Sequence, residues 1–377
     1  MISSPLLLVG VVTGAAALAF WLDRRIPLLS KVGASLLAIL FGALLSNFGV
    51  VTPESPVYDA VGGPVTSLAI AWLLLAVNLR DLRRAGPRML GAFGLAVVGT
   101  AAGAFLGALV FAGTFGGETW KLAGTLTGTY SGGSVNFVAV GRGVELPDAL
   151  FAGATAADNL TTGLWLGVTL MLPIWLRRFY PTPVPSGADA GDEVGHPFFE
   201  TAPLSTLSLA GLLALGLGLV VASEWVGTLI PAVPAVLWLT TFALVLGHVG
   251  PVAEADGTLQ LGNLALHFFF VIIGIHSRIA EIVAVGIEVF WYTLLVVGLQ
   301  GLVVFGVGRL LRIDVGTLAV SSQAAVGGPS SALAVAVARE WRSLVLPGII
   351  VGLLGYALGN YAGFALAGAV RALGIGL

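Results

Sequence analysis

Long apolar stretches recur along almost the whole chain, separated by short polar breaks. A helix crosses the hydrocarbon core of a bilayer with about 20 apolar residues. By this measure the pattern predicts an all-α polytopic membrane protein with about 12 transmembrane helices, six in each half of the chain. The first six spans are 4–22, 31–51, 61–79, 87–114, 121–141 and 148–176, and the second six are 203–223, 229–249, 260–277, 283–309, 315–338 and 344–372.

A single long polar stretch separates the two sets of spans. It reads "RRFYPTPVPSGADAGDEVGHPFFETAP" and is rich in proline, glycine and acidic residues, which are typical of a loop. We therefore divide the chain into a first repeat at 1–176, a polar linker at 177–203 and a second repeat at 204–377.

Composition narrows the class of protein. Hydrophobic residues make up 57% of the chain and charged residues 10%, whereas a soluble domain carries about 25% charged residues. The net charge of −2 and the lack of a basic tract argue against a nucleic-acid partner. There are no cysteines and the four histidines lack metal-ligand spacing, so we expect no cofactor beyond a coupling ion.

The first apolar segment lacks a basic start and a cleavage site, which indicates a membrane helix and a bacterial inner membrane or an equivalent.

The two halves resemble each other at an offset of roughly 200 residues. "GGSVNFVAV" at 132–140 matches "GGPSSALAV" at 327–335, and "AVNLRDL" at 76–82 matches "GIHSRIA" at 274–280. Duplicated halves with interrupted helices in equivalent places are typical of secondary transporters. Broken backbone survives in lipid only where it lines a cavity or is buried in protein. We therefore predict two broken helices, at 121–141 and 315–338, that cross at mid-membrane.

The distribution of basic residues leaves the relative orientation of the halves open. Arginine and lysine within 24–31 and 80–88 place those loops in the cytoplasm and the N-terminus outside. Six spans per half would make the halves parallel, whereas broken helices of this kind usually belong to inverted repeats. Arg309 and Arg312 favour inversion, while Arg339 and Arg342 oppose it, so we expect that one span is miscounted.

Asp158 is the first candidate for chemistry, because it lies about ten residues into its span and so near mid-membrane. A carboxylate at that depth is costly and usually serves a pathway. It is interpreted either as a cation ligand or proton carrier, or as a structural carboxylate that caps a broken helix; the two roles are compatible. The candidate ion-binding residues are Asp158, Asn159, Thr161, Thr162, Asn136 and Gln323.

Small polar residues at the two breaks are the candidates for substrate binding. Hydroxyl and amide oxygens beside open backbone suit hard cations and small polar solutes, although glycine and serine also serve close helix packing. The occurrence of both breaks in matching repeats favours a site. The candidate substrate-binding residues are Ser131, Gly132, Gly133, Ser134, Asn136, Gly327, Gly328, Ser330, Ser331 and Asn360.

These blocks carry a family resemblance. "TYSGGSVNFVAVGRGVELPDALFAGATAADNL" and "SSQAAVGGPSSALAVAVAREWRSLVLPGIIVGLLGYALGNYAG" resemble the YjcL-like membrane proteins, a family of unknown function. That family is distantly similar to the superfamily of cation:proton antiporters and bile-acid sodium symporters, which implies a core domain with two crossing broken helices held by a panel domain. The antiporters' Asp-Asp or Asn-Asp pair corresponds to Asp158-Asn159 in a different order. The symporters' sodium ligands correspond to Ser134, Asn136, Thr161 and Gln323, while their acidic ligand on the second broken helix has no counterpart.

The leading functional hypothesis is a secondary active transporter of a small, anionic organic solute, coupled to sodium or protons by an elevator-like or rocking motion. The alternatives are a cation:proton antiporter that uses Asp158 and a non-transporting receptor or scaffold. An intramembrane enzyme is not expected, because no second carboxylate, serine–base pair or metal motif lies at depth. The expected surroundings are a lipid bilayer and a small-molecule substrate, and a homodimer is compatible with the sequence.

Overall fold

The computed structural model describes residues 1–30, 33–180, 205–253, 255–277 and 279–376. These residues are almost entirely helical, and their one β-pairing is an isolated bridge between Ile2 and Val51. Most of the linker predicted at 177–203 lies outside the described residues. The helices are α1 Pro5–Arg25, α2 Pro27–Ser30, α3 Ala34–Asn47, α4 Pro56–Ala60, α5 Thr66–Leu75, α6 Leu82–Phe115, α7 Thr119–Thr129, α8 Ser134–Gly143, α9 Asp148–Leu176, α10 Thr206–Leu229, α11 Ala235–Leu246, α12 Gly250–Ala253, α13 Thr258–His276, α14 Ile279–Leu310, α15 Val315–Ala338 and α16 Arg342–Ala372.

The prediction of a multi-pass membrane protein is confirmed. Seven helical stretches among the described residues are long and apolar enough to cross a bilayer, and one of them, Pro56–Thr129, runs through α4 to α7. Two further apolar helices, α3 and α11, are shorter. The count of about 12 spans is not confirmed, and two of the predicted spans fold back, as described below.

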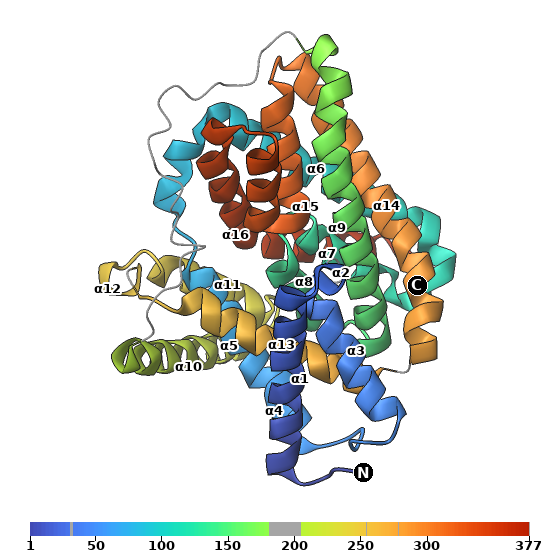
Figure 1. The fold of residues 1–377 in the computed structure, drawn as a ribbon, viewed down its shortest axis with the longest axis vertical. Coiled ribbons are helices and arrows are strands. Elements are labelled where there is room, and N and C mark those ends of the chain that lie inside the picture. Colours follow the sequence, from blue (N-terminus) through green and yellow to red (C-terminus); the bar gives the residue numbers. More distant parts are fainter. Residues whose placement is uncertain (31–32, 181–204, 254, 278, 377) are drawn as a thin grey trace.

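The helices form two groups, which are visible in Figure 1. One group contains α1, α3, α5, α10, α11 and α13, and the other contains α6 to α9 and α14 to α16. Within the second group, α6 and α14 pack closely because Gly99, Gly103 and Gly107 face Gln300, Val296 and Tyr292 at four-residue intervals. Small residues at this spacing let helix backbones approach in lipid, where packing replaces the hydrophobic effect.

Contacts between helix ends define two sides of the molecule. On side A, the Asn47 side-chain amide at the end of α3 donates to the backbone oxygen of Ser277, which follows α13, at 3.1 Å. His276 at the end of α13 lies 3.0 Å from the carboxylate of Asp148, the first residue of α9. The N-terminus also lies on side A, because its β-bridge partner closely follows α3.

Side B is the opposite side, at the C-terminal end of α9, and we assign to it the C-terminal ends of α5, α11 and α14 as well. The backbone amide of Leu79, which follows α5, donates to the ring of His248, which follows α11, at 2.8 Å. The hydroxyl of Tyr180, which follows α9, donates to the backbone oxygen of Phe305 near the end of α14 at 2.6 Å. α9 therefore leads from side A, where Asp148 contacts His276, to side B, where Tyr180 contacts Phe305.

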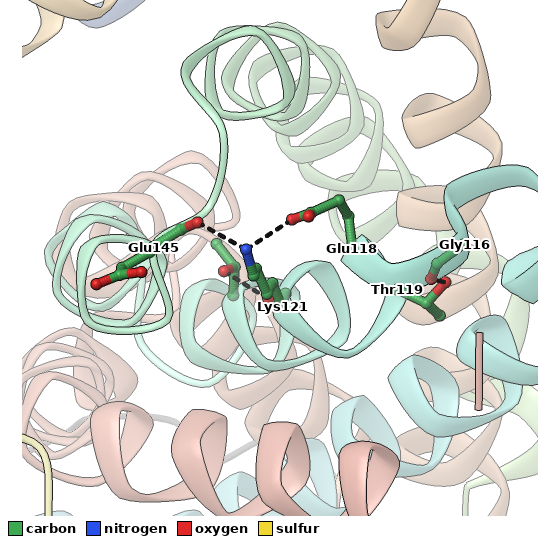
Figure 2. Close-up of polar contacts among 6 residues, drawn as sticks. Gly116, Glu118, Thr119, Lys121 and Glu145 are labelled. Carbon is green, nitrogen blue, oxygen red and sulfur yellow. Dashed lines mark hydrogen bonds and ion pairs between the residues drawn. The ribbon is translucent and has the colours of Figure 1, made fainter. Parts of the chain in front are cut away.

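The segment predicted as a membrane-crossing broken helix at 121–141 does not cross, which corrects that prediction. The ammonium group of Lys121, at the start of α7, donates to the backbone oxygen of Glu145, just after α8, at 3.1 Å, and pairs with Glu118 at 3.0 Å. Figure 2 shows Lys121 between these two partners. Gly128 and Gly141 also contact the opposite helix. Since α7 begins where α8 ends, the two helices form a hairpin that enters and leaves on side A.

The segment predicted at 315–338 folds back as well, and the same correction applies. The backbone of Gly328 inside α15 is not helical, with φ 74° and ψ −167°. A methyl group built on Gly348 would lie 2.5 Å from the Val320 side chain and 3.4 Å from that of Ala332. In a continuous helix these two residues would be about 18 Å apart. We name 119–143 hairpin 1 and 315–338 hairpin 2.

The hairpins can be tested by chemical labelling, because the chain has no native cysteine. Gly117→Cys and Glu145→Cys flank hairpin 1, and Leu311→Cys and Glu340→Cys flank hairpin 2; the substituted residues are exposed. We expect both members of a pair to react with a membrane-impermeant maleimide from the same side, and the two pairs from opposite sides. If Gly117→Cys and Glu145→Cys reacted from opposite sides, hairpin 1 would be contradicted and the segment would cross the membrane.

Candidate functional site

The tips of the two hairpins meet inside the second helix group. Gly133 (φ 112°) ends the tip of hairpin 1, and Gly328 (φ 74°) forms the tip of hairpin 2. A methyl group built on Gly133 would lie 3.6 Å from Cα of Gly328, and one built on Gly328 would lie 3.1 Å from the backbone oxygen of Gly132. Positive φ favours glycine at both positions. The predicted pairing of the two glycine breaks therefore corresponds to a direct contact.

Each tip is followed by the N-terminus of a half-helix, one starting at Ser134 and the other at Pro329. The first N–H groups of a helix have no partner inside it and carry a partial positive charge. Ser134 and Ser330 are both exposed, while Ser331 packs against Gly327. Two helix N-termini thus start beside the tip contact, each with an accessible hydroxyl.

A glycine face on α16 holds both tips, and the sequence analysis missed it. Gly352 packs against the Gly328–Pro329 backbone, Gly355 against Ser131 and Gly132, and Gly359 against Asn136. The amide nitrogen of Asn136 donates to the backbone oxygen of Gly355 at 2.8 Å. The signal was present in the sequence, because glycines recur at one helical face, at 348, 352, 355, 359 and 363.

Asp158 lies on α9, half-buried, beside hairpin 1. Its carboxylate accepts a hydrogen bond from Thr162 one turn away at 3.3 Å. The hydroxyl of Tyr130, from the tip of hairpin 1, lies close to this carboxylate and to the hydroxyls of Thr161 and Thr293, but makes no hydrogen bond of good geometry. Thr161 and Thr293 bond each other at 2.7 Å. Tyr130 and Thr293 were not among the predicted site residues.

Several buried oxygens of hairpin 1 have no partner among the described residues. They are the hydroxyls of Thr129, Tyr130 and Ser131 and the amide oxygen of Asn136, and all four side chains are fully buried. A buried polar atom without a partner costs about 1–3 kcal/mol. Such atoms in one tip therefore point to a ligand or to water.

The predicted ion residue of hairpin 2 joins a separate network with α9 and α14. Gln323 accepts a hydrogen bond from Thr169 at 3.2 Å, and its amide nitrogen has no partner among the described residues. The neighbouring Ser322 donates to Gln300 and accepts from the indole of Trp165, both at 2.9 Å. The network fixes hairpin 2 against the helix that carries Asp158.

Two predicted site residues point elsewhere. The amide nitrogen of Asn159 donates to the backbone of Thr155 at 3.0 Å, and its oxygen faces Gly33 before α3. The amide of Asn360 on α16 donates to Thr240 on α11 at 2.9 Å, while its oxygen has no partner among the described residues. Both residues therefore lie at contacts between the two helix groups.

The fold and the site define a polytopic helical membrane protein with two polar hairpin tips in its interior. The chain belongs to the family described as "Protein of unknown function (DUF819)", which matches residues 10–373. It is 28% identical over 372 residues to the "Uncharacterized membrane protein YjcL" of Bacillus subtilis (strain 168), and the match covers 94% of each chain. The resemblance seen in the sequence is thereby confirmed at the level of the family.

Substitution at the glycine face tests whether α16 holds the tips. A methyl group on Gly355 would lie 2.6 Å from Cα of Gly132 and from the Ser131 backbone oxygen, whereas one on Gly368 would contact nothing. We expect Gly355→Ala to lower the melting temperature of the purified protein, because such overpacking costs about 1–3 kcal/mol. Gly368→Ala is the matched control on the same helix. Equal melting temperatures for both variants would contradict the packing role.

Proposed function

We propose that this protein is a secondary active transporter of a small, anionic organic solute, coupled to sodium or protons. The observation that carries the proposal is the contact of the two hairpin tips, beside unpartnered buried oxygens and the carboxylate of Asp158. Interrupted backbone inside a bilayer is tolerated where it lines a cavity or is buried. Interrupted helices at the interface of two repeats are the usual place of a transporter site.

The hairpins support two inverted repeats, each with five crossing helices and one re-entrant hairpin. In this arrangement α1 begins on side A, whereas its counterpart α10 begins on side B, because the first repeat crosses the membrane an odd number of times. Side B holds most of the described basic residues, which indicates the cytoplasm. In this topology side B carries Arg24, Arg25, Arg80, Arg83, Arg84, Arg88, Arg177, Arg178, Arg309, Arg312, Arg339 and Arg342, and side A carries Lys121, Arg142 and Arg371.

This topology resolves the conflict over the second half. If 315–338 crossed the membrane, Arg312 and Arg339 would lie on opposite sides. When the chain folds back at Gly328, both arginines lie on one side. Hairpin 1 then enters from outside and hairpin 2 from the cytoplasm, and their tips meet between. A solute at the tips is reached from either side when the second helix group moves against the first, by an elevator-like or rocking motion.

The proposed coupling ion binds at Asp158. Sodium takes hard oxygen ligands, such as carboxylate, hydroxyl and carbonyl oxygens. Asp158, Thr162 and the unpartnered hydroxyl of Tyr130 supply oxygens from α9 and from hairpin 1. An ion at this position would link the tip of hairpin 1, beside the proposed solute site, to α9. Such a link allows ion binding to be coupled to solute binding. A cation:proton antiporter is the second candidate, since the same half-buried carboxylate can exchange a proton for sodium.

The solute is proposed to lie at the N-termini of the two half-helices. Their free N–H groups and dipoles favour an anionic group, and the exposed hydroxyls of Ser134 and Ser330 offer additional hydrogen bonds. Uptake of radiolabelled small carboxylates into proteoliposomes tests this, with and without an inward sodium or proton gradient. Gradient-driven uptake supports symport, sodium-driven proton movement without a solute supports antiport, and binding without flux supports a receptor or scaffold.

Removing the Asp158 charge should strongly weaken sodium binding. We expect Asp158→Asn to weaken saturable ²²Na⁺ binding to the purified protein by at least about tenfold, because a hydrogen bond or ligand contact to a charged group contributes about 1.5–3 kcal/mol. Asp81→Asn, at an exposed pair with Arg84 on side B, is the control. If Asp158→Asn bound sodium with wild-type affinity, the ion site would have to lie elsewhere in the protein. If the wild type bound no sodium at any pH, sodium coupling would be excluded.

Removal of the hydroxyl group of Tyr130 or Tyr292 distinguishes an ion ligand from a group that only stabilises the fold. We expect Tyr130→Phe to weaken sodium binding but to leave the melting temperature unchanged or raised, because its hydroxyl is buried without a partner. Tyr292→Phe should instead lower the melting temperature without affecting sodium, because its hydroxyl donates to the Ala104 backbone at 2.6 Å. A loss of stability in Tyr130→Phe with unchanged sodium affinity would remove Tyr130 from the ion site.

A further inference from the structure

A second candidate site lies on side B, away from the hairpin tips, where the chain passes from α5 to α6. An open pocket of about 790 Å³ is found there. Leu79, Arg80 and Arg83 line it from the junction, and Leu244, Val245 and His248 line it from the end of α11. None of these residues takes part in the proposed solute or ion site.

The pocket contains unneutralised positive charge. Arg80 and Arg83 are both exposed. The one carboxylate between them, that of Asp81, pairs instead with Arg84 at 3.5 Å. Arg80 uses one nitrogen to donate to the backbone oxygen of His248 at 3.2 Å, which leaves most of its donors open. Guanidinium groups present paired donors that match the oxygens of a phosphate.

His248 holds the wall of the pocket rather than binding an anion. Its Nε2 atom accepts from the backbone amide of Leu79 at 2.8 Å, and its Nδ1 atom bonds the backbone oxygen of Leu244. Both ring nitrogens are therefore occupied, and they fix the end of α11 against the junction. The arginines remain the groups that can recognise a ligand.

The rest of the lining is mainly apolar. Leu79 and Leu244 form the wall, and Val245 is 63% exposed. A free inorganic anion would gain nothing from these side chains, whereas an acyl chain would. Paired arginines beside an apolar surface at a membrane boundary match a phosphate that is attached to a hydrophobic tail.

We propose that this pocket binds the phosphate headgroup of an anionic phospholipid in the cytoplasmic leaflet, with Arg80 and Arg83 as the phosphate ligands. The assignment to the cytoplasmic leaflet rests on the topology proposed above, whereas the lipid site itself does not depend on transport. Lipid binding here would contact the junction between the two helix groups.

The test is native mass spectrometry of the purified full-length chain in detergent, with added phosphatidylglycerol. We expect Arg83→Gln to weaken the first lipid-binding event by about tenfold, because it removes a charge-assisted contact. Arg83→Lys should retain part of the binding. Arg25 is an exposed arginine that the proposed topology places on the same side, so Arg25→Gln is the matched control. Phosphatidylcholine is the neutral lipid control.

Selective loss of phosphatidylglycerol in Arg83→Gln, with Arg25→Gln equal to wild type, would support the site. Equal binding by wild type and Arg83→Gln would overturn it, as would an equal loss in Arg25→Gln or equal affinity for phosphatidylcholine. Complete displacement of the lipid by millimolar inorganic phosphate would assign the pocket to a soluble anion and overturn the lipid proposal. Each variant is first checked for an unchanged elution volume, and no readout requires transport activity.

Discussion

The structure depends on one constraint: inside a bilayer, every backbone N–H and C=O group needs a partner within the protein. A chain that interrupts two helices in its interior must cover both interruptions. Here the tips cover each other, with Gly133 and Gly328 in contact, and the glycines of α16 let its backbone approach them. Asn136 completes the arrangement by donating to Gly355. Larger residues at these positions would separate the helices and leave the interruptions open to lipid.

The same interruptions set the direction of the chain. A straight continuation beyond Gly133 would carry the chain across the bilayer, whereas the fold-back returns it to the side where it entered. The hydrogen bond between Lys121, at the start of α7, and Glu145, just after α8, shows this return. In the proposed topology, two such returns leave five crossings per half, and an odd number inverts the second half relative to the first. Most of the described basic residues then fall on one side of the membrane.

Charge is also distributed by this architecture. The interior around the tips holds neutral oxygens and nitrogens with one nearby carboxylate, at Asp158, which suits a single cation and a small solute. In the proposed topology most arginines lie on side B, and two of them, Arg80 and Arg83, line a pocket beside the junction of α5 and α6. The proposed transport site and the proposed lipid site are thus separate in both chemistry and position.

Hydropathy and spacing by themselves determined that this is a multi-pass membrane protein and indicated where its helices are interrupted, because apolar length and polar exceptions are local properties of the chain. They also predicted that Asp158 lies at depth. The spacing of glycines in the sequence also contained the glycine face of α16, although this face was not predicted. Only the tertiary structure decided that 121–141 and 315–338 fold back, that Tyr130 lies beside Asp158 and Thr293 beside Thr161, and that Asn159 and Asn360 face other helices. The reason is physical: a glycine permits a turn but does not specify its direction, which is chosen by the packing of helices distant in sequence.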